Sequence, residues 1–189
     1  MTTSIIVTGA SGFIASHLVD QLLVKGYDVI GIDNMRTGKK ENLSDAMNND
    51  KFQLVIADIR DDDLASHIDS DVDVIYHLAA ISSVTLSIED PRLVNDVNTR
   101  GTVNILELAR ESNTKRVVFS SSAAVYGDPE EMPVHEDFGF NPLSPYAASK
   151  IAAEMYIRSY SSAFDIPKSR CYMNNLRFAA LNILLHQLC

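Results

Sequence analysis

The segment SPYAASK, residues 144–150, places a tyrosine four positions before a lysine. Positions i and i+4 share one face of a helix, so Tyr146 and Lys150 would be neighbours there. A free tyrosine has a pKa of about 10 and is a poor base at neutral pH. An adjacent cation typically lowers such a pKa by about 1–3 units. The pair therefore has the composition of an acid–base centre, although the same spacing also occurs on solvated helix surfaces.

A glycine-rich stretch near the N-terminus offers the second component that such a centre needs. The residues TGASGFIA, 8–15, follow an apolar run at 4–8 and open a helical pattern of apolar residues. This order fits a dinucleotide-binding turn, in which Gly9 permits the tight turn and Gly12 lets a pyrophosphate approach the backbone. The helix N-terminus adds N–H donors and positive potential. The sequence therefore predicts a coenzyme site beside the N-terminal helix.

An acidic residue at the end of the second apolar run indicates which coenzyme binds. Asp33 lies twenty-one positions after Gly12, where a carboxylate can bind both hydroxyls of the adenosine ribose. The same carboxylate repels a 2′-phosphate, so we expect NAD rather than NADP. Arg36, Lys39 and Lys40 follow closely and keep NADP as the alternative.

Short apolar segments alternate with longer helical patterns along the chain. Strands separated by helices pair in parallel through right-handed crossovers. The sequence therefore predicts an α/β fold, a doubly wound parallel sheet of the Rossmann type with helices on both faces. Ligands bind at the carboxyl ends of the strands in such sheets, where Ser122 and Tyr146 can meet. We expect strands at 4–8, 28–32, 52–56, 72–77 and 117–120, and helices at 13–26, 91–112 and 146–163.

The charge and cysteine content exclude several classes of protein. The chain of 189 residues has a formal net charge of −9, and its acidic residues are spread rather than clustered. Nucleic acids and anionic membrane surfaces require clustered Lys and Arg, so we expect neither as a partner. No apolar run reaches the ~18 residues of a membrane span, and the first residues do not resemble a signal peptide. Cys171 and Cys189 suit neither a disulfide framework nor a metal site, so we expect no bound metal and a cytoplasmic location.

Seven motifs, in this order and spacing, resemble the extended short-chain dehydrogenase/reductase family. The resemblance covers about residues 3–165 and is strongest to the NAD-dependent nucleotide-sugar epimerases and dehydratases, in particular the UDP-glucose 4-epimerases. The motifs are TGASGFIASHL (8–18), DNMRTGKKENL (33–43), ADIRD (57–61), HLAA (77–80), NTRGTVNILELA (98–109), SSSAAVYG (120–127) and SPYAASK (144–150).

The resemblance implies a reaction and a role for each matching residue. Tyr146 would remove a proton from a sugar hydroxyl while hydride passes to NAD, and hydride would return to the opposite face of the keto-sugar. The substrate would be a nucleotide sugar, most simply a UDP-sugar, and the helices at 91–112 and 146–163 would form a four-helix bundle in a homodimer. The catalytic residues would be Ser122, Tyr146 and Lys150. The NAD-binding residues would be Gly9, Ser11, Gly12, Phe13, Ile14, Asp33, Asn34, Asp58, Ile59, Leu78, Ala79, Ala80, Asn98, Tyr146 and Lys150.

Three small residues bear on the type of reaction. Dehydratases of this family place an acidic residue directly after the position of Ser122, where this chain has Ala123 and Ala124. This difference favours a 4-epimerase or a keto-sugar reductase over a dehydratase. Ser82 occupies a position where some 4-epimerases carry a lysine, so the epimerase subtype stays open.

The resemblance ends near Asp165. We expect a NAD-binding Rossmann domain at 1–165 and an atypical tail at 166–189 in place of the substrate-binding lobe of the family. A NAD-binding module or dimerisation fragment without turnover is therefore the alternative function. Apolar residues of the tail could form a helical stripe covering the sheet edge beside the fifth strand: Leu176, Ala180, Ile183, Leu184 and Leu188.

Overall fold

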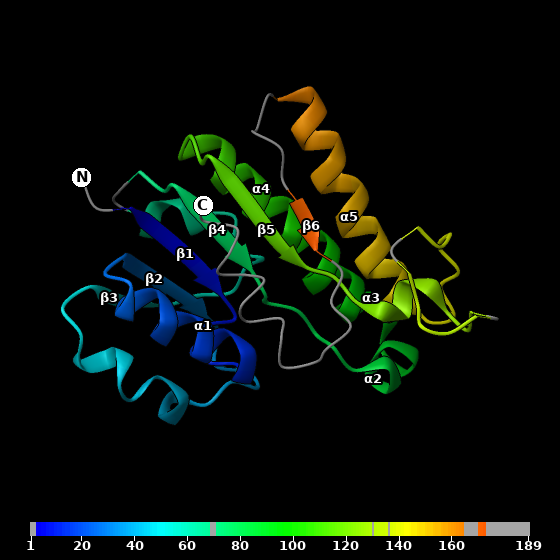
Figure 1. Cartoon of the computed structure of the whole chain (residues 1–189), viewed down its shortest axis with the longest axis horizontal. Helices are drawn as coiled ribbons and strands as arrows, with labels where there is room; N and C mark the ends of the chain where they lie inside the picture. The colour runs from blue at the N-terminus through cyan, green and yellow to red at the C-terminus, as the bar shows by residue number, and fades with distance from the viewer. Residues whose placement is uncertain (1–2, 69–70, 130, 136, 165–169, 173–189) are drawn as a thin grey trace.

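Six parallel strands form a single sheet in the order β3-β2-β1-β4-β5-β6 (Figure 1). The computed structural model describes residues 3–68, 71–129, 131–135 and 137–164, and the backbone of 170–172. Because β1 has β2 on one side and β4 on the other, the strand order reverses there, and the predicted doubly wound fold is confirmed. The strands are β1 (Ser4–Thr8), β2 (Asp28–Asp33), β3 (Phe52–Ile56), β4 (Val74–His77), β5 (Arg116–Ser120) and β6 (Arg170–Tyr172).

The predicted helix at 91–112 is present as three consecutive segments, with one turn of π-helix in the middle. The structure adds α2 and several short 3₁₀ helices, which are too short to produce a periodic apolar pattern. The helices are α1 (Phe13–Val24), α2 (Val84–Glu89), α3 (Pro91–Asn95), the π-helical η4 (Asp96–Arg100), α4 (Gly101–Glu111) and α5 (Pro145–Ala163). The 3₁₀ helices are η1 (Lys40–Leu43), η2 (Ala46–Asn48), η3 (Leu64–His67) and η5 (Ala123–Tyr126).

Helices cover both faces of the sheet, so its central strands are apolar on both sides. Successive strand residues point to opposite faces, which places Ile5 and Val7 against α1, whereas Ile6 faces α4 and α5. Figure 1 shows α1 on one side of the sheet and the long helices on the other. None of the helices in the described ranges combines the length and the apolar content that crossing a lipid bilayer requires.

The predicted tail contributes a strand to the sheet. Residues Arg170–Tyr172 pair in parallel with Val118–Ser120 of β5, so backbone of the tail lies beside the edge where the sequence predicts an apolar helix. Three residues are too few to show strand alternation, which explains why the sequence does not predict β6. The apolar stripe from Leu176 to Leu188 lies outside the described residues, and the division into 1–165 and 166–189 stays a prediction.

A buried polar network joins the ends of β1 and β4 to α4. The two ring nitrogens of His77 lie 2.8 Å from Thr8 Oγ1 and 3.0 Å from Thr102 Oγ1. Thr102 Oγ1 donates its proton to the carbonyl of Asn98, so it can only accept from His77 Nε2. Thr8 Oγ1 accepts from the N–H groups of Leu78 and Ala79, so its own proton goes to Nδ1. Every donor and acceptor is satisfied when His77 is neutral and carries its proton on Nε2.

The burial of His77 makes the fold sensitive to acid. Burial, with the nearby charge of Lys150 as a smaller contribution, lowers the pKa of His77 to about 3. An unfolded histidine has a pKa of about 6.5, so between these two values the unfolded chain binds a proton that the folded chain does not. The contribution of neutral His77 to the free energy of unfolding is therefore fully present well above pH 6.5 and is lost as the pH drops toward 3.

We predict that the free energy of unfolding falls by roughly 2 kcal/mol between about pH 7.5 and pH 5 because of His77 alone. The measurement is denaturant unfolding across that pH range. The His77→Gln variant should be less stable at neutral pH by about 1–3 kcal/mol, because it leaves buried hydroxyls unsatisfied, and should show a flatter pH dependence. The exposed His67 provides the matched control, and His67→Gln should keep the wild-type slope. An unchanged slope in His77→Gln would contradict the assignment.

Candidate coenzyme and catalytic site

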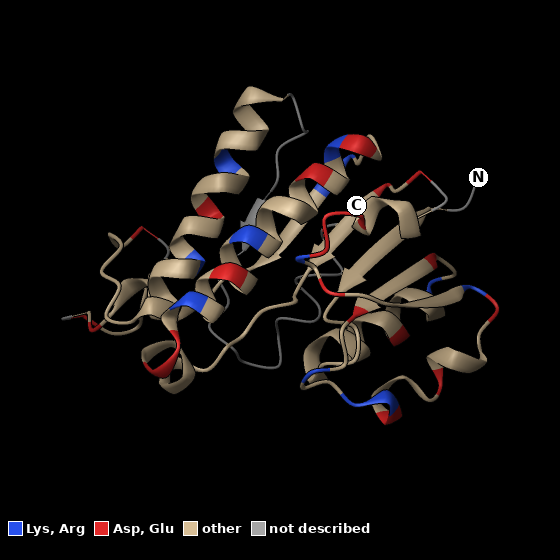
Figure 2. Ribbon diagram, turned by 180° about the vertical axis from the view of Figure 1, so that it is seen from behind, with Lys and Arg blue, Asp and Glu red and all other residues tan. Residues whose placement is uncertain are grey.

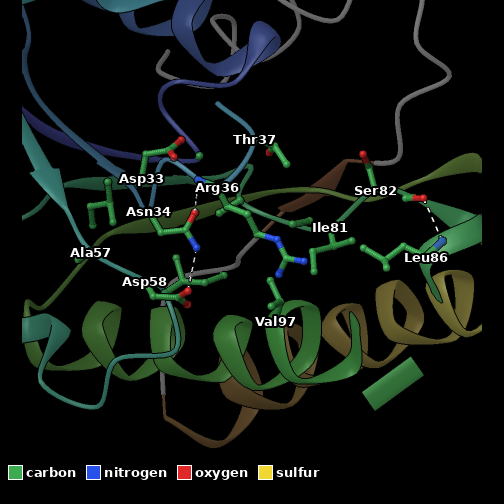
Figure 3. A pocket seen from close by; sticks show the side chains of 16 residues that line it. Asp33, Asn34, Arg36, Thr37, Ala57, Asp58, Ile81, Ser82, Leu86 and Val97 are labelled. Carbon is green, nitrogen blue, oxygen red and sulfur yellow. Dashed lines mark hydrogen bonds between the residues drawn. The ribbon is translucent and has the colours of Figure 1, made fainter. Parts of the chain in front are cut away.

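Two cavities meet at the carboxyl ends of the strands and form one groove. The larger cavity, of about 610 Å³, lies between the turn after β1 and the start of α5. The smaller, of about 250 Å³, lies between the loops that follow β2, β3 and β4 (Figure 3). We refer to the two together as the groove, because they share six lining residues: Gly9, Asp33, Thr37, Ala79, Ala80 and Ser82.

Most of the predicted site residues line this groove. The structure brings together residues from six separate segments of the chain. Ser11 and Asn98 are buried behind the groove rather than lining it. The lining residues are Gly9, Gly12, Phe13, Ile14, Asp33, Asn34, Asp58, Ile59, Leu78, Ala79, Ala80, Ser122, Tyr146 and Lys150.

The turn after β1 fits a pyrophosphate because Gly9 requires glycine and Gly12 presents no side chain to a ligand. Gly9 has a φ of +70°, and a Cβ on it would lie 3.0 Å from the backbone nitrogen and Cα of Ala79. Gly12 precedes α1 and donates its N–H to the carbonyl of Gly9 at 2.9 Å. The first N–H groups of a helix have no partner within the helix, so those of α1 are available to an anion.

Asp33 links the turn to the loop that follows β2. Its Oδ2 accepts from the N–H of Ser11 at 3.0 Å, and its Oδ1 accepts from the N–H of Met35 at 2.7 Å. The side chain of Ser11 is fully buried, and its Oγ has no hydrogen-bond partner among the described residues. Gly38 packs directly over that hydroxyl, since a Cβ on Gly38 would lie 1.8 Å from Ser11 Oγ. Ser11 therefore acts through its backbone, by orienting the carboxylate of Asp33 in the groove.

A set of ion pairs borders the end of the groove formed by the loops after β2 and β3. Asp58 Oδ1 accepts from the N–H and Nε of Arg60, both at 2.9 Å. Asp58 Oδ2 accepts from Arg60 Nη2 at 2.9 Å and from Asn34 Nδ2 at 2.8 Å, a bond visible in Figure 3. Arg60 also bonds Asp96 at 3.0 Å. The Arg60 hydrogen bonds hold the pKa of Asp58 well below its usual range. A ligand here meets a carboxylate whose four acceptor positions are already occupied.

Helix α5 brings Tyr146 and Lys150 to the opposite end of the groove. Ser144 caps this helix by accepting from the N–H of Ala147 at 3.1 Å, and Pro145 occupies its first turn, so Tyr146 lies at the mouth. Both side chains are almost fully buried, with 7% of Tyr146 and 3% of Lys150 exposed. Lys150 Nζ lies 4.3 Å from the ring centre of Phe119, a cation–π contact that holds the ammonium beside β5.

Ser122 and Asn98 complete the surroundings of this pair. Ser122 follows β5, lines the groove with Tyr146, and accepts from the N–H of Ala124 at 3.2 Å. Asn98 lies on the π-helical turn and holds the loop after β4 with two bonds to Ile81, at 2.8 Å and 3.0 Å. Its Nδ2 also donates to Ser149 Oγ at 3.0 Å. Asn98 therefore ties the groove wall to α5 next to Lys150.

Four buried residues around the groove were not predicted from the sequence. Thr8 and His77 form the network described above, and only the position of His77 in the motif HLAA signals it. Ser121 and Glu154 meet across the gap between β5 and α5, where the hydroxyl of Ser121 donates to Glu154 Oε1. The separation of Glu154 from Tyr146, eight positions on one helix, is the signal that could have revealed it.

The chain matches known proteins over most of its length. A family model described as GDP-mannose 4,6 dehydratase matches residues 6–178. The UDP-glucose 4-epimerase of Mycolicibacterium smegmatis is 47% identical over 163 residues, which are 85% of this chain and 52% of that protein. The chain therefore spans about half the length of the curated relatives that it matches.

Solved structures of both reaction types share this fold. The UDP-glucose 4-epimerase of Thermus thermophilus, solved in complex with NAD, has a TM-score of 0.79 and 34% identity, over 90% of this chain and 54% of that one. The dTDP-glucose 4,6-dehydratase of Streptomyces venezuelae, also solved with NAD, has a TM-score of 0.85 and 33% identity, over 90% and 55%. By its motifs, its fold and these matches, the chain belongs to the nucleotide-sugar epimerase and dehydratase branch of the extended short-chain dehydrogenase/reductase family.

Proposed function

We propose that this chain catalyses the NAD-dependent epimerisation of a nucleotide sugar, most simply a UDP-sugar, in the manner of a UDP-glucose 4-epimerase. One observation carries the proposal: the glycine turn, Asp33 and the trio of Ser122, Tyr146 and Lys150 all line a single groove. A coenzyme seated on the turn would extend toward the phenol of Tyr146. The reducing cytoplasm remains the proposed location, since the chain has only two cysteines.

The residues present fit NAD as the coenzyme. The turn at Gly9 and Gly12 would hold the pyrophosphate through backbone N–H groups, and Asp33 would accept from the adenosine ribose. When bound, NAD supplies a hydride acceptor and a second positive charge near Tyr146. Solved relatives with NAD support this choice.

The catalytic residues would act on the proton of the sugar hydroxyl. Tyr146 Oη would accept this proton, and the ammonium of Lys150 would favour the phenolate that does so. Ser122 Oγ would hydrogen-bond the same sugar oxygen and fix its direction. Because Tyr146 returns the proton when the sugar is reduced again, the same residue serves in both halves of an epimerisation.

The composition of the groove favours epimerisation over dehydration. Loss of water from a sugar needs an additional acid near the reacting carbons. Within the larger cavity, the only carboxylate among the described lining residues is that of Asp33, which lies at the adenosine end. Ala123 lies directly after Ser122, where it cannot transfer a proton.

A second candidate function is NAD binding without turnover. The chain spans about half the length of its curated relatives. The family resemblance implies that the lobe gripping the nucleotide sugar belongs to the other half. Both candidates require the coenzyme, and only the first requires interconversion of UDP-glucose and UDP-galactose. The two experiments below therefore separate them.

We predict that Gly12→Ala weakens NAD binding by at least about tenfold, because its Cβ occupies the path of the pyrophosphate. The backbone of Gly12, with φ −72°, accepts alanine, and the added Cβ would meet only the carbonyl of Gly9, at 3.1 Å. The Kd is measured by calorimetric titration, and the thermal midpoint should change little. Gly139→Ala is the matched control, since nothing lies within 4 Å of the added Cβ. Equal Kd values for the two variants would contradict the proposed site.

We predict that Tyr146→Phe lowers turnover of UDP-galactose by about 10²–10⁴-fold while NAD binding stays within a few-fold of wild type. This substitution removes only the hydroxyl that would accept and return the proton. Tyr156→Phe is the control, because Tyr156 lies on the same helix but is 43% exposed. Wild-type turnover in Tyr146→Phe would eliminate Tyr146 as the base, and NAD binding without any wild-type turnover would favour the second candidate.

We further propose a homodimer through the face formed by α5 and the α3–η4–α4 column. These helices lie side by side on one face of the molecule, with acidic and basic residues interspersed (Figure 2). Exposed apolar side chains of α2 and α5 extend this face, including Ile88 at 67%, Met155 at 39% and Tyr156 at 43% exposure. Burial of such side chains between two copies would favour association.

We predict that Met155→Glu converts the dimer to a monomer, because a charge would replace an apolar side chain that is buried between the two copies. The measurement is light scattering coupled to size-exclusion chromatography. Val24→Glu is the control, since Val24 is 82% exposed at the end of α1, on the other face of the sheet. A monomeric wild type at high concentration would contradict the dimer.

A further inference from the structure

A buried carboxylate lies one helical turn beyond Lys150. Glu154 has no exposed side-chain surface, although charged side chains are almost never fully buried unless they are paired. It lies four positions after Lys150 and eight after Tyr146, so all three are on the same face of α5. No role in proton transfer to the sugar falls to it, because it does not line the groove.

The hydrogen bonding of Glu154 is directed at a single partner. Its Oε1 accepts from the hydroxyl of Ser121, and its Oε2 has no hydrogen-bond partner among the described residues. Arg158 Nη2 lies 4.0 Å away on a side chain that is 63% exposed, so water screens most of its attraction. An acceptor buried with so little compensation costs stability, and its one strong contact is with Ser121.

Ser121 connects that contact to the groove. It follows β5 directly, is 8% exposed, and lines the groove between Ser120 and Ser122. Ser122 caps the N-terminus of η5, and the N–H groups of Ala124 and Val125 bond back to the Ser122 hydroxyl and carbonyl. Fixing Ser121 therefore fixes the start of η5 and the direction of the Ser122 side chain.

We propose that Glu154 is a positioning residue that locks the Ser121–Ser122 segment to α5. Tyr146 and Lys150 are on the helix, whereas Ser122 is on the strand end, and the Ser121–Glu154 bond joins these two elements. The bond sets the Ser122 hydroxyl at a constant distance from the Tyr146 phenol. The effect on turnover rests on the proposed function, whereas the effect on the position of the segment does not.

Hydrogen–deuterium exchange of the unliganded protein tests the positioning without any need for activity. Glu154→Leu removes the acceptor at similar volume, Ser121→Ala removes the donor, and Glu154→Gln keeps an acceptor and is the matched control. We expect faster exchange at residues 121–127 in the first two variants and exchange near wild type in Glu154→Gln. Exchange at residues 5–15 should stay unchanged. Unchanged exchange at 121–127, or a uniform increase along the whole chain, would overturn the proposal.

Kinetics provide the second readout. If a misplaced Ser122 costs turnover, kcat in Glu154→Leu and in Ser121→Ala should fall by up to about 10²-fold, with the Kd for NAD unchanged. The double variant should lose no more than either single variant, because both remove the same bond. Additive losses would overturn the proposal. If the wild-type protein shows no turnover but the variants exchange faster at 121–127 alone, the positioning role is supported and the proposed epimerase is not.

Discussion

The close approach of the β1 turn to the loop after β4 is the contact on which the rest of the site depends. At Gly9 the two backbones are so near that an added methyl group would touch Ala79 at 3.0 Å. This approach occurs where the strand order of the sheet reverses, and there the loops leave in opposite directions and open a crevice. The hydroxyl of Thr8 maintains it by accepting from the N–H groups of Leu78 and Ala79. The groove follows from that single junction.

Buried polar residues, rather than the apolar core, connect the elements around this groove. His77 joins β4 to β1 and α4, Asn98 joins the loop after β4 to α5, and Glu154 joins the end of β5 to α5. Apolar packing is tolerant of small shifts, whereas hydrogen bonds depend on distance and direction. The polar contacts thus specify the relative positions of segments that the core only holds together.

An acidic protein can bind an anionic coenzyme only if the local arrangement overcomes its overall charge. The net charge of −9 gives no long-range attraction to a pyrophosphate. Backbone N–H groups at the start of α1 provide the local positive potential instead. Of the two carboxylates among the described lining residues, Asp58 is paired with Arg60, whereas Asp33 carries no ion pair. The electrostatic potential in this groove is therefore set by individual groups and not by the net charge of the protein.

The sequence by itself determined the fold class and most of the groove. Strands, helices and the glycine turn depend on local periodicity and backbone conformation, and the five predicted strands and the long helices follow from these. Most of the fourteen lining residues came from the resemblance of the sequence motifs to a known family. Only the tertiary structure decided that Ser11 and Asn98 act from behind the groove, that β6 pairs with β5, and that Glu154 is buried against Ser121. These facts depend on contacts between residues far apart in the chain. No local sequence pattern indicates which polar side chain will be buried. Sequence periodicity therefore predicts the helices and strands, whereas the role of each polar side chain depends on its burial in the folded protein.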